Sequence, residues 1–245
     1  MGIGPTCSDA DYVGYMMTLP SQNERSVTRQ AEVTLRRLIL EGVMQPGQRL
    51  NELELSASLG ISRSPIREAL QRLAKEGVVE LVANRGAFVA KFDLTQVEEL
   101  YEVRETLECR AASLAAQRAT PEDLAELKHV LAATRLALGN SNPGYPPELD
   151  FHALLVRAAH NRQLVQLAAA IDAQLRVARG RSGYIPERAR VAYQEHLAVY
   201  EAVVTGDIEA APRLIRAHLA ASKRNLRQRV IGDDQGEAEA VKETG

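Results

Sequence analysis

The sequence has few cysteines and no long apolar runs. Cys7 and Cys109 are far apart and neither belongs to a C-x-x-C pair, so we expect neither a disulfide framework nor a paired-cysteine site. Nowhere do about 18 apolar residues follow one another. Asp9 and Asp11 interrupt the first twenty residues, which argues against a secretory signal. These absences predict a cytoplasmic protein with no membrane partner.

Tryptophan is absent, aromatic residues make up 4% of the chain, and the formal net charge is only -2. A hydrophobic fraction of 45% and a charged fraction of 25% are typical of a soluble globular protein. Alanine and leucine supply much of the apolar content and favour helices. Residues 24–91 hold 11 Lys and Arg against 8 Asp and Glu, a net +3. Because this excess is small, net charge alone does not indicate nucleic-acid binding. The evidence must come from the positions of the individual charges.

Residues 23–92 follow a helix, helix, turn, helix, hairpin order. Asn51 is a candidate N-cap for a short second helix, and Gly60 is placed to end it. The third helix is expected over 63–76, started by Ser62 and Pro65 and ended by Gly77. Two strands, 78–82 and 87–91, are joined by "ANRG". This order predicts a winged helix-turn-helix domain, preceded by a disordered segment over 1–22.

Residues 93–230 show helical patterns and no convincing strand signal. We place helices over 94–118, 121–138, 147–159, 162–179, 187–205 and 207–229. The ending "GDDQGEAEAVKETG" predicts a disordered tail over 231–245. The fold class is therefore mainly α, with an N-terminal winged helix-turn-helix domain followed by an all-α helical bundle.

The helix over 63–76 carries two stripes. One is apolar and is expected to face the core: Ile66, Leu70 and Leu73. The other holds Arg63, Arg67 and Gln71. This polar stripe could be an ordinary solvated face, but it lies in the part of a helix-turn-helix that reaches base edges in the major groove. Guanidinium groups suit bidentate bonding to guanine or paired contacts to phosphate, and Arg85 at the wing tip is a third candidate.

The five histidines all lie beyond residue 128. His152 is four residues after Glu148, so the two share one helical face. His196 and His218 fall on the last two predicted helices, which could aim them at one point. One carboxylate and three imidazoles would suit a divalent cation such as Zn, Ni or Mn; buried, hydrogen-bonded histidines are the alternative. His129 and His160 are expected at the surface or at helix ends.

Three segments within residues 28–91 are "PGQRL", "SRSPIREALQRLAKEG" and "NRGAFV". Through these segments the region resembles the DNA-binding domain of GntR-type bacterial transcription regulators. The resemblance implies operator contacts from the first turns of the recognition helix and from the wing tip. We predict that the contacting residues are Arg63, Ser64, Arg67, Gln71, Asn84, Arg85 and Gly86. Leu53 departs from the family pattern, because some members have a basic contact residue there.

Residues 94–229 resemble the FCD type of effector domain through "LYEVRETLECRAASLAAQ", "FHALLVRAAHN" and "EHLAVYEAVVTGDIEAAPRLIRAHL". The resemblance implies a divalent metal ion held by a carboxylate and three histidines. These match Glu148, His152, His196 and His218, with glutamate where the family has aspartate. It also implies that Arg104 binds the effector; a simple pair with Glu108, four residues on, is the alternative.

Together these features predict a ligand-responsive transcription regulator, a repressor in the commoner case. We expect a homodimer that reads an inverted-repeat operator in double-stranded DNA and senses a small organic acid. A metal-free sensor of an anionic metabolite is the first alternative. A metalloenzyme built on the histidines is the second, but no further base or nucleophile accompanies them and the DNA-reading domain would be left unexplained.

Overall fold

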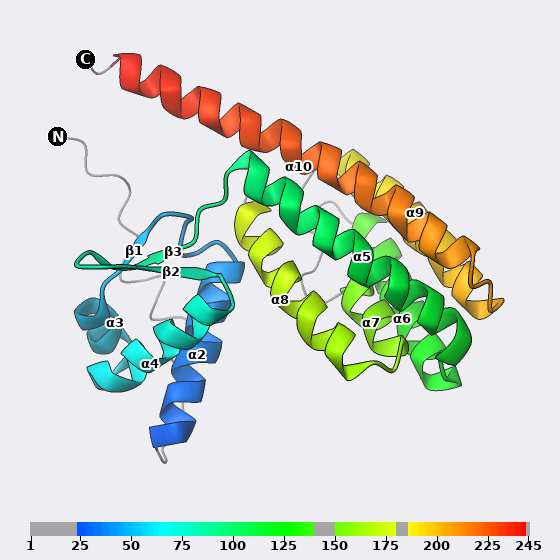
Figure 1. Cartoon of the computed structure of the whole chain (residues 1–245), viewed down its shortest axis with the longest axis horizontal. Coiled ribbons are helices and arrows are strands. Elements are labelled where there is room, and N and C mark those ends of the chain that lie inside the picture. Colours follow the sequence, from blue (N-terminus) through cyan, green and yellow to red (C-terminus); the bar gives the residue numbers. More distant parts are fainter. Residues whose placement is uncertain (1–23, 140–149, 180–185, 244–245) are drawn as a thin grey trace. The chain divides into compact units, whose positions relative to one another are not determined.

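The computed structural model describes residues 24–139, 150–179 and 186–243 of the 245. The predicted segment 1–22 and the candidate ligand Glu148 lie outside these residues. The chain divides into two compact units. The first unit contains residues up to Phe92 and a short second stretch from Ala173, and the second unit contains the rest (Figure 1). No helix in the described part of the chain is both long enough and apolar enough to cross a membrane.

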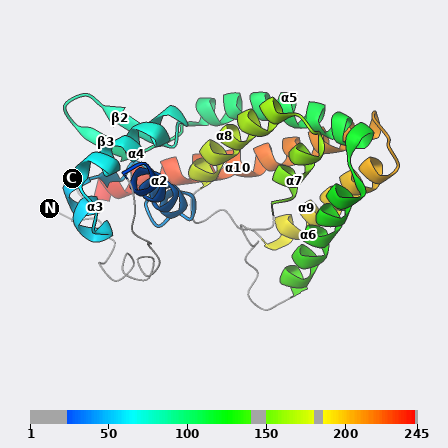
Figure 2. The ribbon, with the colours of Figure 1, turned by 90° about the horizontal axis from the view of Figure 1, so that it is seen from below.

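Three helices build most of the first unit: α2 (Glu24–Leu40), α3 (Glu52–Leu59) and α4 (Arg63–Lys75). The Asn51 side chain accepts a hydrogen bond from the Leu53 amide, and Gly60 adopts a left-handed φ of 65°. Both features were predicted, because each end of α3 carries a residue suited to it. Ser62 stands in the extended N-cap conformation of α4 but makes no side-chain capping bond. Figure 2 shows α2, α3 and α4 beside one another.

The core of the first unit confirms the predicted apolar stripe of α4. Ile66, Leu70 and Leu73 are almost completely buried and belong to the same cluster as Leu35 and Leu38 of α2. This packing leaves the opposite face of α4 to solvent. Ala173 and Val177, at the end of α8, also belong to this cluster. The sequence predicts one domain over 93–230, and these two residues pack with the core of the first unit instead.

The wing consists of β2 (Val79–Val82) and β3 (Gly86–Val89), which pair antiparallel with Val82 opposite Gly86. Asn84 and Gly86 adopt positive φ values of 62° and 98°, which glycine and asparagine tolerate best. A two-residue strand, β1 (Arg49–Leu50), adds to the outer side of β3. Sequence reasoning missed β1, because two residues carry no periodicity.

The second unit is a helical bundle. Its elements are α5 (Leu94–Arg118), α6 (Pro121–Gly139), α7 (Phe151–Ala158), most of α8 (Arg162–Arg179), α9 (Pro186–Val204) and α10 (Ala210–Glu243). The helix α10 continues through Glu243, over residues for which the sequence predicts a disordered tail from 231. Alanine, glutamate and lysine in this stretch are good helix formers, and they outweigh the two glycines.

The bundle core brings α7, α9 and α10 together. Phe151, Leu155, Val199, Ile215 and Leu219 are buried in one cluster. The helices α5, α9 and α10 run alongside one another in this unit (Figure 1). The mainly helical fold with a small antiparallel wing is the predicted fold class.

Candidate nucleic-acid interface and metal centre

The outer face of α4 carries the residues predicted to contact DNA. The side chains of Arg63 and Arg67 are 59% and 58% exposed. Ser64 and Gln71 are also exposed, whereas Pro65 and Ile66 between them are buried. Because the apolar stripe fixes the rotation of α4, the two arginines project from the first two turns of the helix. They can therefore reach a neighbouring molecule without any change in the core.

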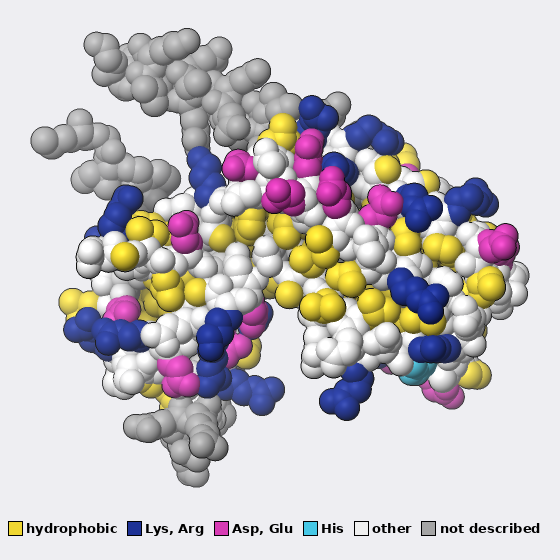
Figure 3. Space-filling view, viewed as in Figure 1, with side chains coloured by type: hydrophobic (Ala, Val, Ile, Leu, Met, Phe, Trp, Pro, Cys, Tyr) yellow, Lys and Arg dark blue, Asp and Glu magenta, His cyan; other side chains and the backbone are white. Residues whose placement is uncertain are grey.

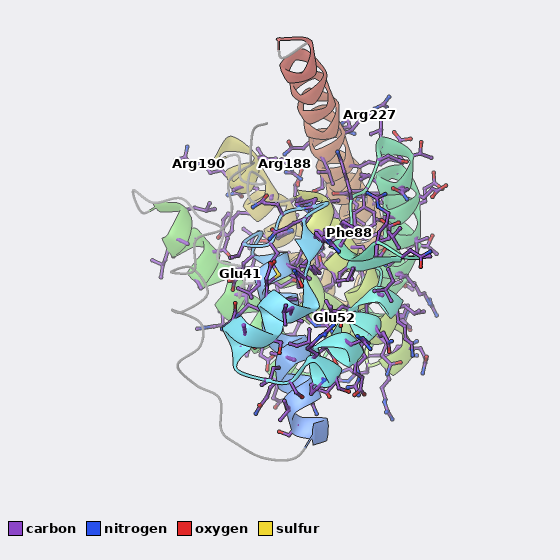
Figure 4. All side chains as sticks on the ribbon, turned by 90° about the vertical axis from the view of Figure 1, so that its left-hand side faces the viewer. Glu41, Glu52, Phe88, Arg188, Arg190 and Arg227 are labelled. Atoms are coloured by element: carbon purple, nitrogen blue, oxygen red, sulfur yellow. The ribbon has the colours of Figure 1, made fainter. Side chains whose placement is uncertain are left out.

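Glu52, the first residue of α3, contacts both arginines. Arg67 Nε donates to Glu52 Oε1 at 3.0 Å, and Arg67 Nη2 donates to Oε2 at 2.8 Å. Arg63 Nη2 lies 3.6 Å from Oε2. Hydrogen bonding from Arg67 is the main cause that lowers the pKa of Glu52, so the group stays a carboxylate. Figure 4 labels Glu52 against the helices α3 and α4. Sequence reasoning missed this contact, which joins residues 15 positions apart on different helices.

The opposite flank of α4 is held to α2 by charged groups. Arg72 lies 2.6 Å from Glu68 on its own helix and 3.3 Å from Glu32 on α2. Arg36 of α2 donates through Nη2 to Glu76 at 2.6 Å. These ion pairs join α4 to α2 and help to fix the position of α4. The Arg72 side chain is also less exposed, at 41%, than those of Arg63 and Arg67.

The wing tip exposes all three of its predicted contact residues, Asn84, Arg85 and Gly86. The Arg85 guanidinium lies 5.7 Å from the centroid of the Phe88 ring, a cation–π arrangement. Phe88 is labelled in Figure 4. No acidic residue within the described part of the chain lies at ion-pair distance from Arg85. Its charge is thus available to an external partner.

Three histidines from three helices converge in the second unit. The Nε2 atoms of His152 (α7), His196 (α9) and His218 (α10) lie 3.1 to 3.3 Å from one another. His196 and His218 are buried, and the His152 side chain is 16% exposed. The Phe151 ring stacks on His196 with centroids 4.5 Å apart. The predicted meeting of these three residues is therefore present.

Two carboxylates orient the imidazoles. Glu108 of α5 lies 2.6 Å from His152 Nδ1, and Glu195 of α9 lies 2.7 Å from His218 Nδ1. A carboxylate only accepts hydrogen bonds, so each Nδ1 carries the proton and each Nε2 keeps its lone pair. His196 Nδ1 is buried and has no hydrogen-bond partner among the described residues. The three lone pairs can thus be directed at one point.

Arg104 of α5 extends this chain of contacts. Its Nε donates to Glu108 Oε1 at 2.5 Å, and both side chains are almost fully buried. Burial alone would raise the pKa of Glu108, but the charge of Arg104 and the hydrogen bond with His152 hold it well below its usual range. Burial alone would likewise lower the pKa of Arg104, yet the Glu108 charge raises it. The pair is therefore ionised, and Arg104 acts on His152 through Glu108.

Arg188 and Glu195 of α9 form the corresponding pair beside His218. Arg188 Nη1 lies 2.8 Å from Glu195 Oε2. Burial would raise the pKa of Glu195, but the hydrogen bond from His218 and the charge of Arg188 lower it. Burial lowers the pKa of His218 to about 4, against an opposing hydrogen bond with Glu195, and burial also lowers the pKa of His196 well below its usual value. Both imidazoles are therefore neutral near pH 7, the form that binds metal ions.

The residues present fit a divalent metal ion. Where the lone pairs of three imidazole nitrogens point at one another this closely they repel, and a cation between them would remove that repulsion. Nitrogen ligands about 2.1 Å from one ion are about 3.0 to 3.4 Å apart in octahedral or tetrahedral geometry, which brackets the observed spacings. The carboxylates on His152 and His218 are the outer partners that metal-binding histidines commonly have.

The structure does not place every predicted residue at this cluster. Glu148, the expected fourth ligand and partner of His152, lies outside the described residues, and Glu108 occupies the partner position. His160 lies at a helix end and contacts Asp123 at 2.7 Å, and His129 is exposed, as expected of both. Glu108, Glu195 and Arg188 were missed as parts of the site. A signal for Glu108 existed: Arg104 and Glu108 continue the buried stripe of Val97 and Tyr101 along α5.

Comparisons with known proteins agree with this architecture. Residues 27–89 match the family model "Bacterial regulatory proteins, gntR family", and residues 99–221 match the FCD domain. The chain is 33% identical over 177 residues to the Nta operon transcriptional regulator of Aminobacter aminovorans, covering 71% of this chain and 82% of that one. It is 30% identical over 211 residues to the HTH-type transcriptional repressor RspR of Escherichia coli, covering 82% and 90%.

Solved structures show the same fold. The structure of E. coli McbR/YncC matches with a TM-score of 0.74 at 23% identity, covering 83% of this chain and 98% of that one. A GntR-type regulator from Rhodococcus sp. RHA1 matches with a TM-score of 0.65 at 24% identity, covering 81% and 96%. Two family models in the expected order, together with relatives matched over most of their length, settle the family. The chain belongs to the GntR family of bacterial regulatory proteins, carries an FCD domain, and is a transcription regulator rather than an enzyme.

Proposed function

We propose that this regulator is a homodimer that reads an inverted-repeat operator and responds to a small organic acid in a metal-containing helical domain. The convergence of three histidine Nε2 atoms carries the proposal, since family membership alone assigns no metal or ligand to this chain. Repression relieved by the effector is the mode that we propose. The repressor RspR among the relatives supports that sign.

The DNA-reading half rests on the exposed face of α4 and on the wing. Arg63, Ser64, Arg67 and Gln71 are proposed to enter the major groove, where arginine forks bond guanine O6 and N7. Asn84, Arg85 and Gly86 are proposed to contact the DNA beside them. Two copies related by a two-fold axis would place two recognition helices on two half-sites, so the operator is expected to be an inverted repeat.

The sensing half rests on the histidine cluster. His152, His196 and His218 would hold Zn, Ni or Mn, with Glu148 proposed as a fourth ligand. When bound, the ion would supply a Lewis-acid site for effector carboxylate oxygens. Glu108 and Glu195 keep the Nε2 lone pairs of His152 and His218 directed at the shared point. Arg104 is proposed as a cationic partner of the effector in addition to its bond with Glu108.

Effector binding would change operator affinity by a coupling free energy of about 1 to 3 kcal/mol. By reciprocity, operator DNA would weaken effector binding by the same factor. An effector that bound the DNA-binding and the non-DNA-binding conformations equally well would leave operator affinity unchanged. The proposed effector must therefore bind the non-DNA-binding conformation more tightly.

The test begins with elemental analysis of the purified chain and a thermal-shift screen of organic acids, with and without added metal. An acid that raises the melting temperature only in the metal-loaded protein, and that weakens operator binding, is the expected result. Metal-loaded protein whose operator affinity responds to none of the acids that bind it would overturn the sensing role. An equal thermal shift in the metal-free chain would favour a sensor that needs no metal.

A further inference from the structure

One carboxylate serves both exposed arginines of the recognition helix. Glu52 of α3 accepts two hydrogen bonds from Arg67, and its Oε2 lies within ion-pair distance of Arg63. Glu52 is only 26% exposed, whereas each arginine is more than half exposed. The anion is thus set back against the protein while the cations project. Such an arrangement is unexpected at a surface meant to attract a polyanion.

The bonds to Glu52 fix the orientation of the Arg67 guanidinium. A guanidinium is planar and offers two pairs of parallel N–H groups, one along the Nε/Nη2 edge and one along the Nη1/Nη2 edge. Glu52 occupies the first edge. The second edge is therefore directed away from α3, and it is the edge that a guanine O6/N7 pair can accept from. Orientation before binding reduces the entropy that Arg67 loses when it contacts a base.

The same carboxylate changes the charge that DNA meets. Two arginines and one glutamate leave a local charge of about +1 rather than +2. A phosphate oxygen that approached Arg67 would also approach the Glu52 carboxylate and be repelled by it. A base-edge acceptor carries no net charge and avoids most of that repulsion. Figure 3 shows basic and acidic side chains interleaved over the visible face of the first unit, not a patch of one sign.

We propose that Glu52 is a specificity-determining residue, which orients Arg67 toward a base edge and keeps phosphate away from the Arg63 and Arg67 pair. The proposal rests on the proposed DNA-reading role of these arginines. Glu52 touches the reading groups rather than the DNA and acts as their positioning residue. Its removal should change the selectivity of the protein more than its affinity for the operator.

The test compares E52Q with wild type on two duplexes, using the full-length chain. One duplex is an operator obtained by in vitro selection with the wild-type protein, and the other is a scrambled duplex of equal length and composition. E52Q is expected to bind the scrambled duplex more tightly, with a log–log salt slope steeper by about 0.9 for each arginine released to phosphate. The ratio of operator to scrambled affinity is expected to fall by about fivefold or more.

The variant E54Q is the matched control. Glu54 lies on the same helix, is exposed, and accepts a hydrogen bond from Asn51 rather than from either arginine. E54Q removes the same charge, so it is expected to alter binding to both duplexes by the same factor. A second variant, E52D, keeps the charge on a shorter stem. It should bind the scrambled duplex as weakly as wild type but lose operator affinity.

The outcomes separate this inference from the proposed function. An R67A variant that loses operator affinity, beside an E52Q variant with unchanged selectivity and salt slope, would overturn the role of Glu52 and leave the reading role of α4 standing. R67A with full operator affinity would refute the reading role itself. E52Q binding both duplexes more weakly by one factor would assign Glu52 a structural role only, and would also overturn the inference.

Discussion

The Nε2 atoms of His152 and His218 lie 3.1 Å apart, although 66 positions separate the two residues in the chain. The Nδ1 atom of each ring contacts a carboxylate that orients the ring: Glu108 for His152 and Glu195 for His218. Each carboxylate is in turn paired with an arginine. The cluster thus contains two similar sets of a histidine, a carboxylate and an arginine, from different helices. In both sets the histidine Nε2 lone pair points at the same place. Helix packing alone does not require such an arrangement, and the arrangement would suit a divalent metal ion.

The first prediction concerns the donors themselves. His196→Gln removes one of the three Nε2 atoms with little change in volume, so we expect the purified variant to lose its stoichiometric metal. A metal present at 100 times its Kd stabilises the native state by about 2.7 kcal/mol. Wild-type protein should therefore melt at a lower temperature after chelation, and the variant should not respond. Elemental analysis and calorimetry measure both effects.

The control for this prediction is His129→Gln. His129 is exposed on α6, away from the three converging nitrogens. The change should leave metal content and the response to chelator as they are in wild type. Full metal occupancy in His196→Gln would exclude the cluster as the binding site.

The second prediction concerns the buried pair that supports His152. Glu108→Gln leaves Arg104 buried without its counter-charge, so the free energy of unfolding should fall by about 3 to 5 kcal/mol. Metal affinity should fall by about 10- to 100-fold, because His152 loses the group that orients it. Urea denaturation and metal titration test the two effects separately.

Glu105→Gln is the matched control for that experiment. Glu105 is one turn before Glu108 on the same helix, and its pair with Arg216 at 2.9 Å is exposed to solvent. Such pairs contribute about 0 to 1 kcal/mol.

The double variant Arg104→Met with Glu108→Gln should be less destabilised than the sum of the single changes. Additive losses would mean that the two side chains do not depend on each other.

Much of the first unit could be predicted from the sequence because its signals are local. The N-cap at Asn51, the left-handed Gly60 and the wing turn at Asn84 and Gly86 each depend on residues a few positions away. The strand Arg49–Leu50 could not be predicted, because the strand that it pairs with, β3, lies much later in the chain. Over residues 231–243 composition alone suggests disorder, whereas the backbone there is helical.

The candidate site was predicted in part. Family motifs pointed to His152, His196 and His218, whose rings meet in the structure. Spacing along one helix pointed to Glu148 as the partner of His152, but tertiary packing places Glu108 of α5 there. Pairing between helices depends on their rotation and offset, which periodicity does not report. The contact of Glu52 with Arg67 was missed for the same reason.

The third prediction tests base reading by α4. Arg67→Ala should weaken operator binding by about 1 to 3 kcal/mol and relax selectivity at one base position of each half-site. Lys75→Ala is the matched control, since Lys75 is exposed at the opposite end of the same helix. Lys75→Ala also removes one positive charge, but at the end of α4 that is not proposed to enter the major groove. Binding to a set of operators with single base changes measures the effect, and an unchanged base profile in Arg67→Ala would refute base reading.

The fourth prediction assigns a different task to the wing. Arg85 is exposed at the wing tip, its guanidinium lies over the Phe88 ring, and no acidic residue in the described part of the chain pairs with it. With no carboxylate to repel phosphate, Arg85 should contact the DNA backbone. Arg85→Ala should therefore weaken operator and scrambled duplex by the same factor, and reduce the log–log salt slope by about 0.9. Titrations at several salt concentrations measure the slope. A loss confined to the operator, with the slope unchanged, would show instead that Arg85 reads a base.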